Sequence, residues 1–258
     1  DNGVAAAMYA ACKATVKVGD GNEISLHEQT NYPFEETIRF TVNTPKAVSF
    51  PFYLRIPSWT EGATIFVNGK KVAANPEAGQ YACINREWKD NDQVEIQLPM
   101  QLSMRTWQVN KNSVSVDYGP LTMSLKIDED YVKKDSRATA IGDSKWQEGA
   151  DASQWPTYEI YAKTPWNYAL VLGKNEPLKD FKVVHKEWPA DNFPFTVAST
   201  PIEVKAIGRK VPSWVIDQYD LCSELPEMDA PKGEKEEITL IPMGAARLRV
   251  SAFPNTRE

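Results

Sequence analysis

Histidine and cysteine are scarce in this sequence of 258 residues, which contains two histidines and three cysteines. The cysteines, Cys12, Cys83 and Cys222, lie far apart, and no two of them have the short spacing that is typical of a zinc site. An odd number of cysteines also leaves at least one thiol outside any disulfide within the chain. The sequence therefore lacks a local metal-binding motif, and it predicts that the three cysteines are small buried hydrophobic residues.

Long apolar runs and clusters of positive charge are also missing. No apolar run approaches the roughly 18 residues that a membrane span needs. Lys and Arg total 29 against 35 Asp and Glu, a formal net charge of −6. Nucleic acids and anionic membranes both attract basic surfaces, so we expect neither as a partner. The chain begins at Asp1 without a start Met or a signal region, and we expect a fragment of a longer protein.

Helical periodicity is the third absence, because no segment repeats apolar residues at helical spacing over several turns. Alternation with a period of two is common instead: Phe52, Leu54 and Ile56 alternate with larger polar residues and proline. Asn68 and Gly69 form the residue pair that a two-residue hairpin turn prefers. The pattern predicts antiparallel strands at residues 50–59, 63–67, 80–85 and 92–98.

The predicted fold is all-β, with two antiparallel β-sandwich domains in tandem and negligible helix. Pro99 and the change of pattern that follows it place the boundary at residues 101–103. The first sandwich then covers residues 1–103 and the second covers residues 104–258. The charged run at residues 126–137 is the alternative boundary.

A polar stretch interrupts the second domain at residues 128–156. It is rich in Asp, Lys, Gly and Ser and poor in branched apolar residues. Such a stretch buries too little apolar surface to become ordered by itself. We therefore predict a long surface excursion here.

Several short motifs follow one another in an order that resembles glycoside hydrolase family 127. They are Phe52-Tyr53-Leu54-Arg55-Ile56-Pro57-Ser58-Trp59, Val67-Asn68-Gly69, Arg86-Glu87-Trp88-Lys89-Asp90-Asn91-Asp92, Leu98-Pro99-Met100 and Tyr118-Gly119-Pro120-Leu121. The chain is similar to the β-sandwich region that follows the catalytic barrel in β-L-arabinofuranosidase-type enzymes. The resemblance covers the first half well and continues more thinly to Arg247-Leu248-Arg249. It also favours a strand at residues 4–11, although the alanines there have high helix propensity.

The resemblance implies that the chain is the non-catalytic C-terminal portion of its parent and packs against a helical barrel. In the family, a cysteine beside a zinc site made of other cysteines and a glutamate attacks the substrate, all within that barrel. None of the three cysteines here belongs to an adjacent pair, so no catalytic or metal-binding residue is carried over. Zinc is expected only in the missing barrel. The parent is expected to be periplasmic or secreted and to act on plant-type glycans such as β-linked L-arabinofuranosides.

The residues themselves do not identify a catalytic group either. A glycosidase commonly uses two carboxyl groups about 5 Å apart or more, and most of the 35 acidic residues here lie in predicted turns. We interpret them as solvated surface charge. His27 and His185 show no order with serine and aspartate that would indicate a catalytic triad.

Tryptophan is the residue type that offers a sugar-binding function, because its ring face stacks on the apolar C–H side of a pyranose. The candidates lie in or beside predicted loops: Trp146, Trp155, Trp166 and Trp188. Packing inside the protein is the alternative for all four, and it is favoured for Trp166, which enters an apolar strand. Trp59 and Trp88 match structural positions of the family and are expected to cap the core of the first sandwich.

Two other functions stay open beside the accessory role. An independent carbohydrate-binding module would present two or three coplanar aromatic rings to a plant-type polysaccharide. A purely structural pair of sandwiches would have neither such a platform nor a surface for the barrel.

Overall fold

The computed structural model describes residues 2–73, 76–135, 151–219 and 221–258. It confirms the all-β prediction, because the helical elements in these ranges are two short 3-10 turns, η1 (Ala152–Gln154) and η2 (Met243–Ala245). No helix within the described part of the chain is long and apolar enough to cross a membrane.

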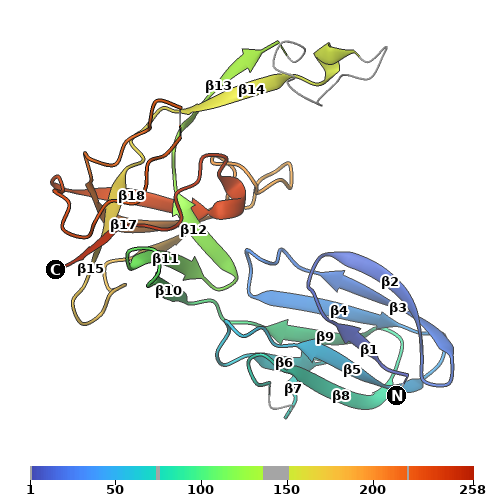
Figure 1. Ribbon diagram of the computed structural model, residues 1–258. Coiled ribbons are helices and arrows are strands. Elements are labelled where there is room, and N and C mark those ends of the chain that lie inside the picture. The colour runs from blue at the N-terminus through green and yellow to red at the C-terminus, as the bar shows by residue number, and fades with distance from the viewer. Residues whose placement is uncertain (1, 74–75, 136–150, 220) are drawn as a thin grey trace. The chain divides into compact units, whose positions relative to one another are not determined.

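The chain divides into two compact units (Figure 1). Unit 1 consists of Asp1–Ser103 and Asp117–Leu121, and unit 2 consists of Met104–Val116 and Thr122–Glu258. The two units are described separately below.

Unit 1 contains two sheets. The larger has the strand order β2-β3-β4-β9-β6-β7 and the smaller has the order β1-β5-β8. Figure 1 shows these strands in the blue-to-green part of the chain. Their bounds are β1 (Val4–Ala6), β2 (Cys12–Val18), β3 (Asn22–Gln29), β4 (Thr37–Asn43), β5 (Val48–Arg55), β6 (Thr64–Val67), β7 (Lys70–Lys71), β8 (Tyr81–Trp88) and β9 (Asp92–Gln97).

The core of unit 1 lies between these sheets and follows the predicted alternation. Phe50, Phe52 and Leu54 of β5 are each at most 1% exposed, whereas their neighbours along the strand are more open. Phe40 of the larger sheet meets Phe52 of the smaller sheet edge to face, with 5.2 Å between ring centroids. Trp88 is fully buried in the same cluster, so its predicted structural role is confirmed.

The predicted hairpin turn is confirmed as well. β6 and β7 are antiparallel neighbours, with Val67 opposite Lys70. Asn68 and Gly69 between them have φ values of 50° and 74°. Both angles are positive, as the tight hairpin turn requires, and this explains why these two residue types stand here.

Unit 2 is built on an eight-stranded sheet with the order β10-β11-β12-β18-β17-β15-β19, where β16 also pairs with β17. A separate two-stranded sheet joins β13 to β14. The strand bounds are β10 (Leu102–Trp107), β11 (Ser113–Tyr118), β12 (Leu121–Leu125), β13 (Glu129–Lys134), β14 (Thr157–Ala162), β15 (Tyr168–Leu172), β16 (Lys182–His185), β17 (Ile202–Lys210), β18 (Lys235–Pro242) and β19 (Asn255–Arg257).

Two strand pairs depart from the predicted antiparallel pattern. β1 runs parallel to β5, with Val4 opposite Phe52, and β15 runs parallel to β19, with Leu170 opposite Asn255. In both pairs one partner is a three-residue strand at the edge of its sheet. Such a short edge strand adds to whichever free edge the chain reaches, and alternation along the sequence carries no information about its direction. The strand predicted at residues 4–11 is also shorter than expected, since it ends at Ala6.

The predicted excursion contains more regular structure than expected. Glu129–Lys134 forms β13 and pairs residue by residue with Thr157–Ala162 of β14. β13 contains Tyr131, and β14 contains Tyr158 and Tyr161. Tyr131 and Tyr158 are in edge-to-face contact, with ring centroids 6.1 Å apart. The cross-strand aromatic contact supplies stabilisation that the polar composition of the stretch concealed. Residues 136–150 of the predicted excursion lie outside the described residues.

The prediction that the cysteines are buried is wrong, because Cys12, Cys83 and Cys222 are all exposed. Cys83 lies on β8 between the buried residues Ala82 and Ile84. Its neighbours therefore fix it on the outer face of the sheet, since successive side chains of a strand point to opposite faces. Its position in the alternation outweighs the general preference of cysteine for the interior.

Glu28 is a buried acidic residue of unit 1, on β3 and 6% exposed. One carboxylate oxygen accepts a hydrogen bond from the backbone N–H of Ala10 at 3.0 Å, and the other accepts one from the Cys12 thiol at 3.7 Å. Burial raises the pKa of Glu28 to about 7, although these two hydrogen bonds partly oppose the shift. Burial of the Tyr9 side chain, together with the nearby Glu28 charge, raises the pKa of Tyr9 as well. Glu28 thus ties the segment between β1 and β2 to the larger sheet, at an electrostatic cost.

This cost predicts how the stability of unit 1 depends on pH. The pKa of Glu28 rises from 4.5 to about 7 on folding, so the free energy of unfolding should fall as pH rises between these values and level off above them. The full loss is about 3 kcal/mol. The glutamine side chain of the Glu28→Gln variant stays neutral at every pH, so this variant should not show the loss of stability. Urea unfolding of both forms across this pH range measures the difference.

Glu23→Gln is the matched control, because Glu23 lies on the same strand and is exposed. It should leave the pH dependence unchanged. A carbon-13 titration of the Glu28 carboxyl group provides a direct check, and a midpoint near the ordinary glutamate value would contradict the assignment.

Candidate functional site

A cavity of about 750 Å³ in unit 2 is the candidate site. Its wall is assembled from four segments that are distant in sequence: Ile127 shortly after β12, the end of β14 with the loop after it, the bridge between Ile216 and Cys222, and the segment before β19. The lining residues are Ile127, Ile160, Tyr161, Ala162, Lys163, Thr164, Pro165, Trp166, Ile216, Cys222, Leu248, Arg249 and Val250.

Trp166 forms the aromatic part of the wall. Its ring contacts Trp214 edge to face, with 5.1 Å between centroids and 70° between the ring planes. Trp214 is itself 4% exposed, and its indole N–H donates to the carbonyl of Ser223 at 3.2 Å. The Asn167 amide donates to the carbonyls of Val211 and Trp214 at 3.1 and 3.2 Å. Trp166 is therefore held in place by packing on one side while it borders the cavity.

Two cations, Lys163 and Arg249, line the cavity. The Lys163 ammonium is 3.3 Å from the carboxylate of Asp130. The Nε of Arg249 donates to the carbonyl of Ala246 at 2.9 Å, which orients the guanidinium group. No acidic residue of the described chain lies in the cavity lining, and within the described part Arg249 makes no ion pair.

Cys222 brings a thiol to the same wall. Its Sγ donates a weak hydrogen bond to the carbonyl of Ser223 at 3.4 Å. Partial burial of the sulfur atom raises the pKa of the otherwise exposed Cys222 thiol, and a hydrogen bond with Trp214 partly opposes this shift. The thiol is therefore mostly protonated at neutral pH and is a poor nucleophile.

The structure does not assemble the four candidate tryptophans into one site. Trp166 lines the cavity, but Trp155 and Trp188 are not among its lining residues. Trp155 is 68% exposed between η1 and β14, and the half-buried Trp188 donates its indole N–H to Asn192 at 2.7 Å. Trp146 lies outside the described residues. Contact of any of the four with sugar stays a prediction.

Sequence reasoning missed Lys163 and Arg249 as site residues. Neither belongs to a recognisable motif, and each is one of 29 basic residues in the chain. Their common location arises from the pairing of distant strands, for which the sequence contains no local signal. Cys222 was singled out only as a buried thiol.

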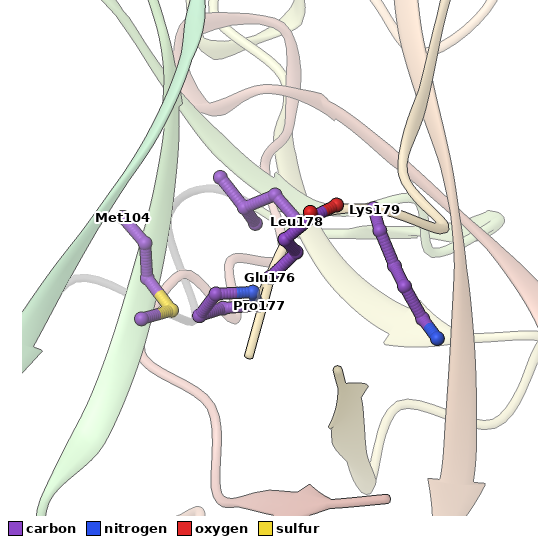
Figure 2. Close-up of a pocket in the computed structure, with 5 residues that line it drawn as sticks. All are labelled: Met104, Glu176, Pro177, Leu178 and Lys179. Carbon is purple, nitrogen blue, oxygen red and sulfur yellow. The ribbon is translucent and has the colours of Figure 1, made fainter. Parts of the chain in front are cut away.

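A second hollow in unit 2 is shallow and apolar. It has a volume of about 380 Å³ and is lined by Met104 of β10 and by residues 176–179 of the loop after β15. Figure 2 shows Met104, Pro177 and Leu178 close together, with the Lys179 ammonium directed away from them. Glu176 and Lys179 are the charged residues of this lining, and it contains no second carboxyl group and no nucleophilic side chain, so we assign no function to this hollow.

Glu203 is the centre of a separate charged cluster on β17 of unit 2. It is 7% exposed, and one of its oxygens lies 3.0 Å from the Lys126 ammonium and 3.1 Å from that of Lys186. Lys205 is 3.7 Å from the other oxygen and donates to the Thr239 hydroxyl at 2.8 Å. Burial raises the pKa of Glu203, but the hydrogen bonds and charges of Lys126 and Lys186 outweigh it, and the net pKa is lowered. The cluster joins β17 to the segments that follow β12 and β16.

In the described ranges no group of three or more His, Cys, Asp or Glu side chains is arranged to hold a metal ion. The site geometry is therefore that of an aromatic and cationic cavity in a β-sheet unit.

Structures of glycoside hydrolases share the fold of the whole chain. A GH127 beta-L-arabinofuranosidase from Geobacillus stearothermophilus T6 has a TM-score of 0.62 at 21% identity, over 99% of this chain and 34% of that chain. A GH127 beta-arabinofuranosidase gives 0.62 at 20% identity over 99% and 35%, and a protein described as a glycoside hydrolase gives 0.62 at 22% identity over 99% and 36%. The chain thus spans about a third of the length of these structures.

The sequence match is narrower and more specific. Residues 3–100 match the family described as "Beta-L-arabinofuranosidase, GH127 middle domain". These residues lie in unit 1. The resemblance to glycoside hydrolase family 127 is thereby confirmed. Among curated proteins, no sequence matches this chain.

The Glu203 cluster leads to a prediction about the stability of unit 2. Glu203→Gln removes the charge that three lysines share, and we expect it to lower the free energy of unfolding by about 1–2 kcal/mol at neutral pH, because the lysines stay partly solvated. The pKa of Glu203 is lowered in the fold, so this contribution is complete above the unfolded-state pKa and is lost as pH falls below it. Urea unfolding at neutral and acidic pH measures the effect.

Glu237→Gln on the neighbouring strand β18 is the matched control, since Glu237 is exposed. It should change stability by less than about 0.5 kcal/mol. An equal effect of the two substitutions, or a difference that persists at acidic pH, would show that the lysine cluster does not stabilise unit 2.

Proposed function

We propose that this chain is the non-catalytic C-terminal β-sandwich portion of a family 127-type glycoside hydrolase. The observation that carries the proposal is the match of residues 3–100 to the GH127 middle domain. It is supported by the fold, which corresponds to 34–36% of the length of the similar structures. In this proposal the chain supports a catalytic helical barrel that belongs to the rest of the parent protein.

Two features of unit 1 support this proposal. The core of unit 1 is fully buried at Phe52, Leu54 and Trp88, each of which is 0% exposed. A closely packed interior has low compressibility and presents a defined surface to a neighbouring domain. The outer face of the small sheet carries Tyr53 and Cys83 opposite each other, and the exposed Tyr81 follows on the same face. Apolar and aromatic groups of this kind are enriched where domains meet.

The remaining parts of the proposal concern the parent. The barrel would hold the zinc ion and the nucleophilic cysteine, and this chain would contribute no ligand to the metal. The substrate would be a plant-type glycan with β-linked L-arabinofuranoside units. The parent would be located in the periplasm or outside the cell, where such glycans are met.

Joint production with the barrel tests this function. We expect the barrel encoded upstream of this chain in its parent gene to co-purify with it in equal amounts and to be less soluble when produced alone. Metal analysis should find zinc in the barrel polypeptide only. Hydrolysis of an aryl β-L-arabinofuranoside by this chain alone, or an equivalent of zinc bound to it, would refute the proposal.

The three exposed thiols provide a control for the interface. Alkylation of Cys12, Cys83 and Cys222 with and without the barrel should reveal slower reaction for the thiols that the barrel covers. If each thiol reacts at the same rate with and without the barrel, the two polypeptides do not pack through these surfaces.

An independent carbohydrate-binding function is the second candidate, and the β13–β14 hairpin favours it. Tyr131 and Tyr158 are 49% and 46% exposed on one face of this hairpin, where Tyr131 pairs with Ile160. Trp155, 68% exposed, lies just before β14. Exposed rings in a group offer stacking surfaces to a polysaccharide.

Calorimetric titration with arabinan and arabinogalactan tests this second function. If the hairpin binds these polymers, Trp155→Ala should weaken binding about tenfold, since one ring–sugar stack contributes roughly 1–1.5 kcal/mol. Tyr81→Ala is the control, because Tyr81 is a comparably exposed ring in unit 1. Absence of heat with both polymers, or equal losses in the two variants, would contradict this function.

A further inference from the structure

The cavity of unit 2 combines features that neither proposed function uses. Its volume of about 750 Å³ lies within the range of small-molecule sites. Its apolar wall contains Ile127, Ile216, Leu248 and Val250, and Trp166 supplies an aromatic surface. Most ligand sites combine such an apolar wall with a few placed polar groups.

The charge of the lining is opposite to that of the chain. The sequence contains 35 acidic and 29 basic residues, yet the described residues of this wall include Lys163 and Arg249 and no acid. An arrangement with two cations and no carboxylate in the wall favours an anionic ligand.

Lys163 and Arg249 differ in the partners that they already have within the protein. Lys163 lies 3.3 Å from Asp130, so its ammonium group already has an anionic partner. Arg249 donates its Nε to the Ala246 carbonyl and has no ion-pair partner in the described ranges. Its remaining N–H groups form the planar fork that matches a carboxylate. A guanidinium group of this kind, beside an apolar wall, is the anion-recognising element of the cavity.

We propose that this cavity binds a sugar residue that carries a carboxylate, a uronic acid, with the carboxylate on Arg249 and the apolar face of the ring against Trp166. The two contacts require a ligand that has both a hydrophobic face and one negative charge. A neutral pyranose satisfies only the tryptophan, and a small inorganic anion satisfies only the arginine. The site is a property of unit 2 and does not depend on the role of the chain beside a barrel.

Equilibrium binding of D-glucuronate and D-galacturonate to the full chain tests the proposal, with D-glucose and acetate as comparison ligands. We expect the uronates to bind at least about tenfold more tightly than either comparison ligand, because each of these lacks one of the two contacts. Rising salt should weaken uronate binding, since the charge contact is screened. Equal binding of glucose and glucuronate would overturn the proposal, as would no uronate binding at tens of millimolar.

Arg249→Gln should weaken uronate binding about tenfold or more and leave glucose binding unchanged. Arg257→Gln is the matched control, because it removes the same charge from an exposed position of unit 2 outside the cavity lining. Arg249→Lys keeps the charge but loses the planar fork, and an intermediate loss is expected. If Arg249→Gln does not fold, the Lys variant decides: unchanged uronate affinity in it would refute the role of the fork.

Cys222 provides an independent readout inside the cavity wall. In a chain with Cys12→Ser and Cys83→Ser, saturating glucuronate should slow alkylation of Cys222 several-fold, at concentrations that match the binding curve. Arg249→Gln should abolish this protection. A chain that retains only Cys83, in unit 1, should react at the same rate with and without ligand. Protection of both thiols alike, or of neither, would place the ligand outside this cavity.

Discussion

Ring packing around Trp88 holds the two sheets of unit 1 together. The centroid of the Trp88 ring lies 5.7 Å from that of Phe50 and 6.0 Å from that of Phe52. Phe52 in turn contacts Phe40 of the opposite sheet. The Trp88 indole N–H donates to the Phe50 carbonyl at 2.9 Å, so the buried polar atom is satisfied. A one-residue slip of β5 would turn both phenylalanines towards solvent, and the register is therefore strongly specified. A scaffold with a fixed register leaves its outer faces free to vary.

The two buried glutamates show how the same side chain acquires opposite properties from its surroundings. Glu28 receives hydrogen bonds from neutral groups only, so burial dominates and raises its pKa. Glu203 is buried to a similar degree, but the charges of Lys126 and Lys186 reverse the direction. Desolvation is thus decisive only where no cation approaches the carboxylate. Acidic pH accordingly weakens unit 2 through Glu203 but relieves the cost of burying Glu28 in unit 1.

The sequence was informative wherever structure depends on neighbours along the chain. The alternation around Phe52 and Leu54 predicted β5 and its buried face, and the Asn68–Gly69 pair predicted the hairpin turn. It was uninformative where distant segments meet. The parallel pairing of β1 with β5 and the strand at Glu129–Lys134 depend on partners elsewhere in the chain. Burial of cysteine was predicted from residue type alone, and that general preference was overruled by position within a strand.

The cavity depends entirely on contacts between distant segments. Trp166 and Arg249 are far apart in sequence, and only the fold brings them to one wall. The Glu203 cluster shows by contrast why Arg249 indicates a ligand site. Lys126 and Lys186 share a buried carboxylate, so their charge is already used within the fold. The Arg249 guanidinium is oriented by a neutral carbonyl, which leaves its charge without compensation beside an apolar surface. Charge–charge attraction strengthens as water is excluded. A ligand whose apolar face covers this wall therefore also strengthens the contact between its negative charge and Arg249. The cavity should for this reason select ligands that have both an apolar face and a negative charge.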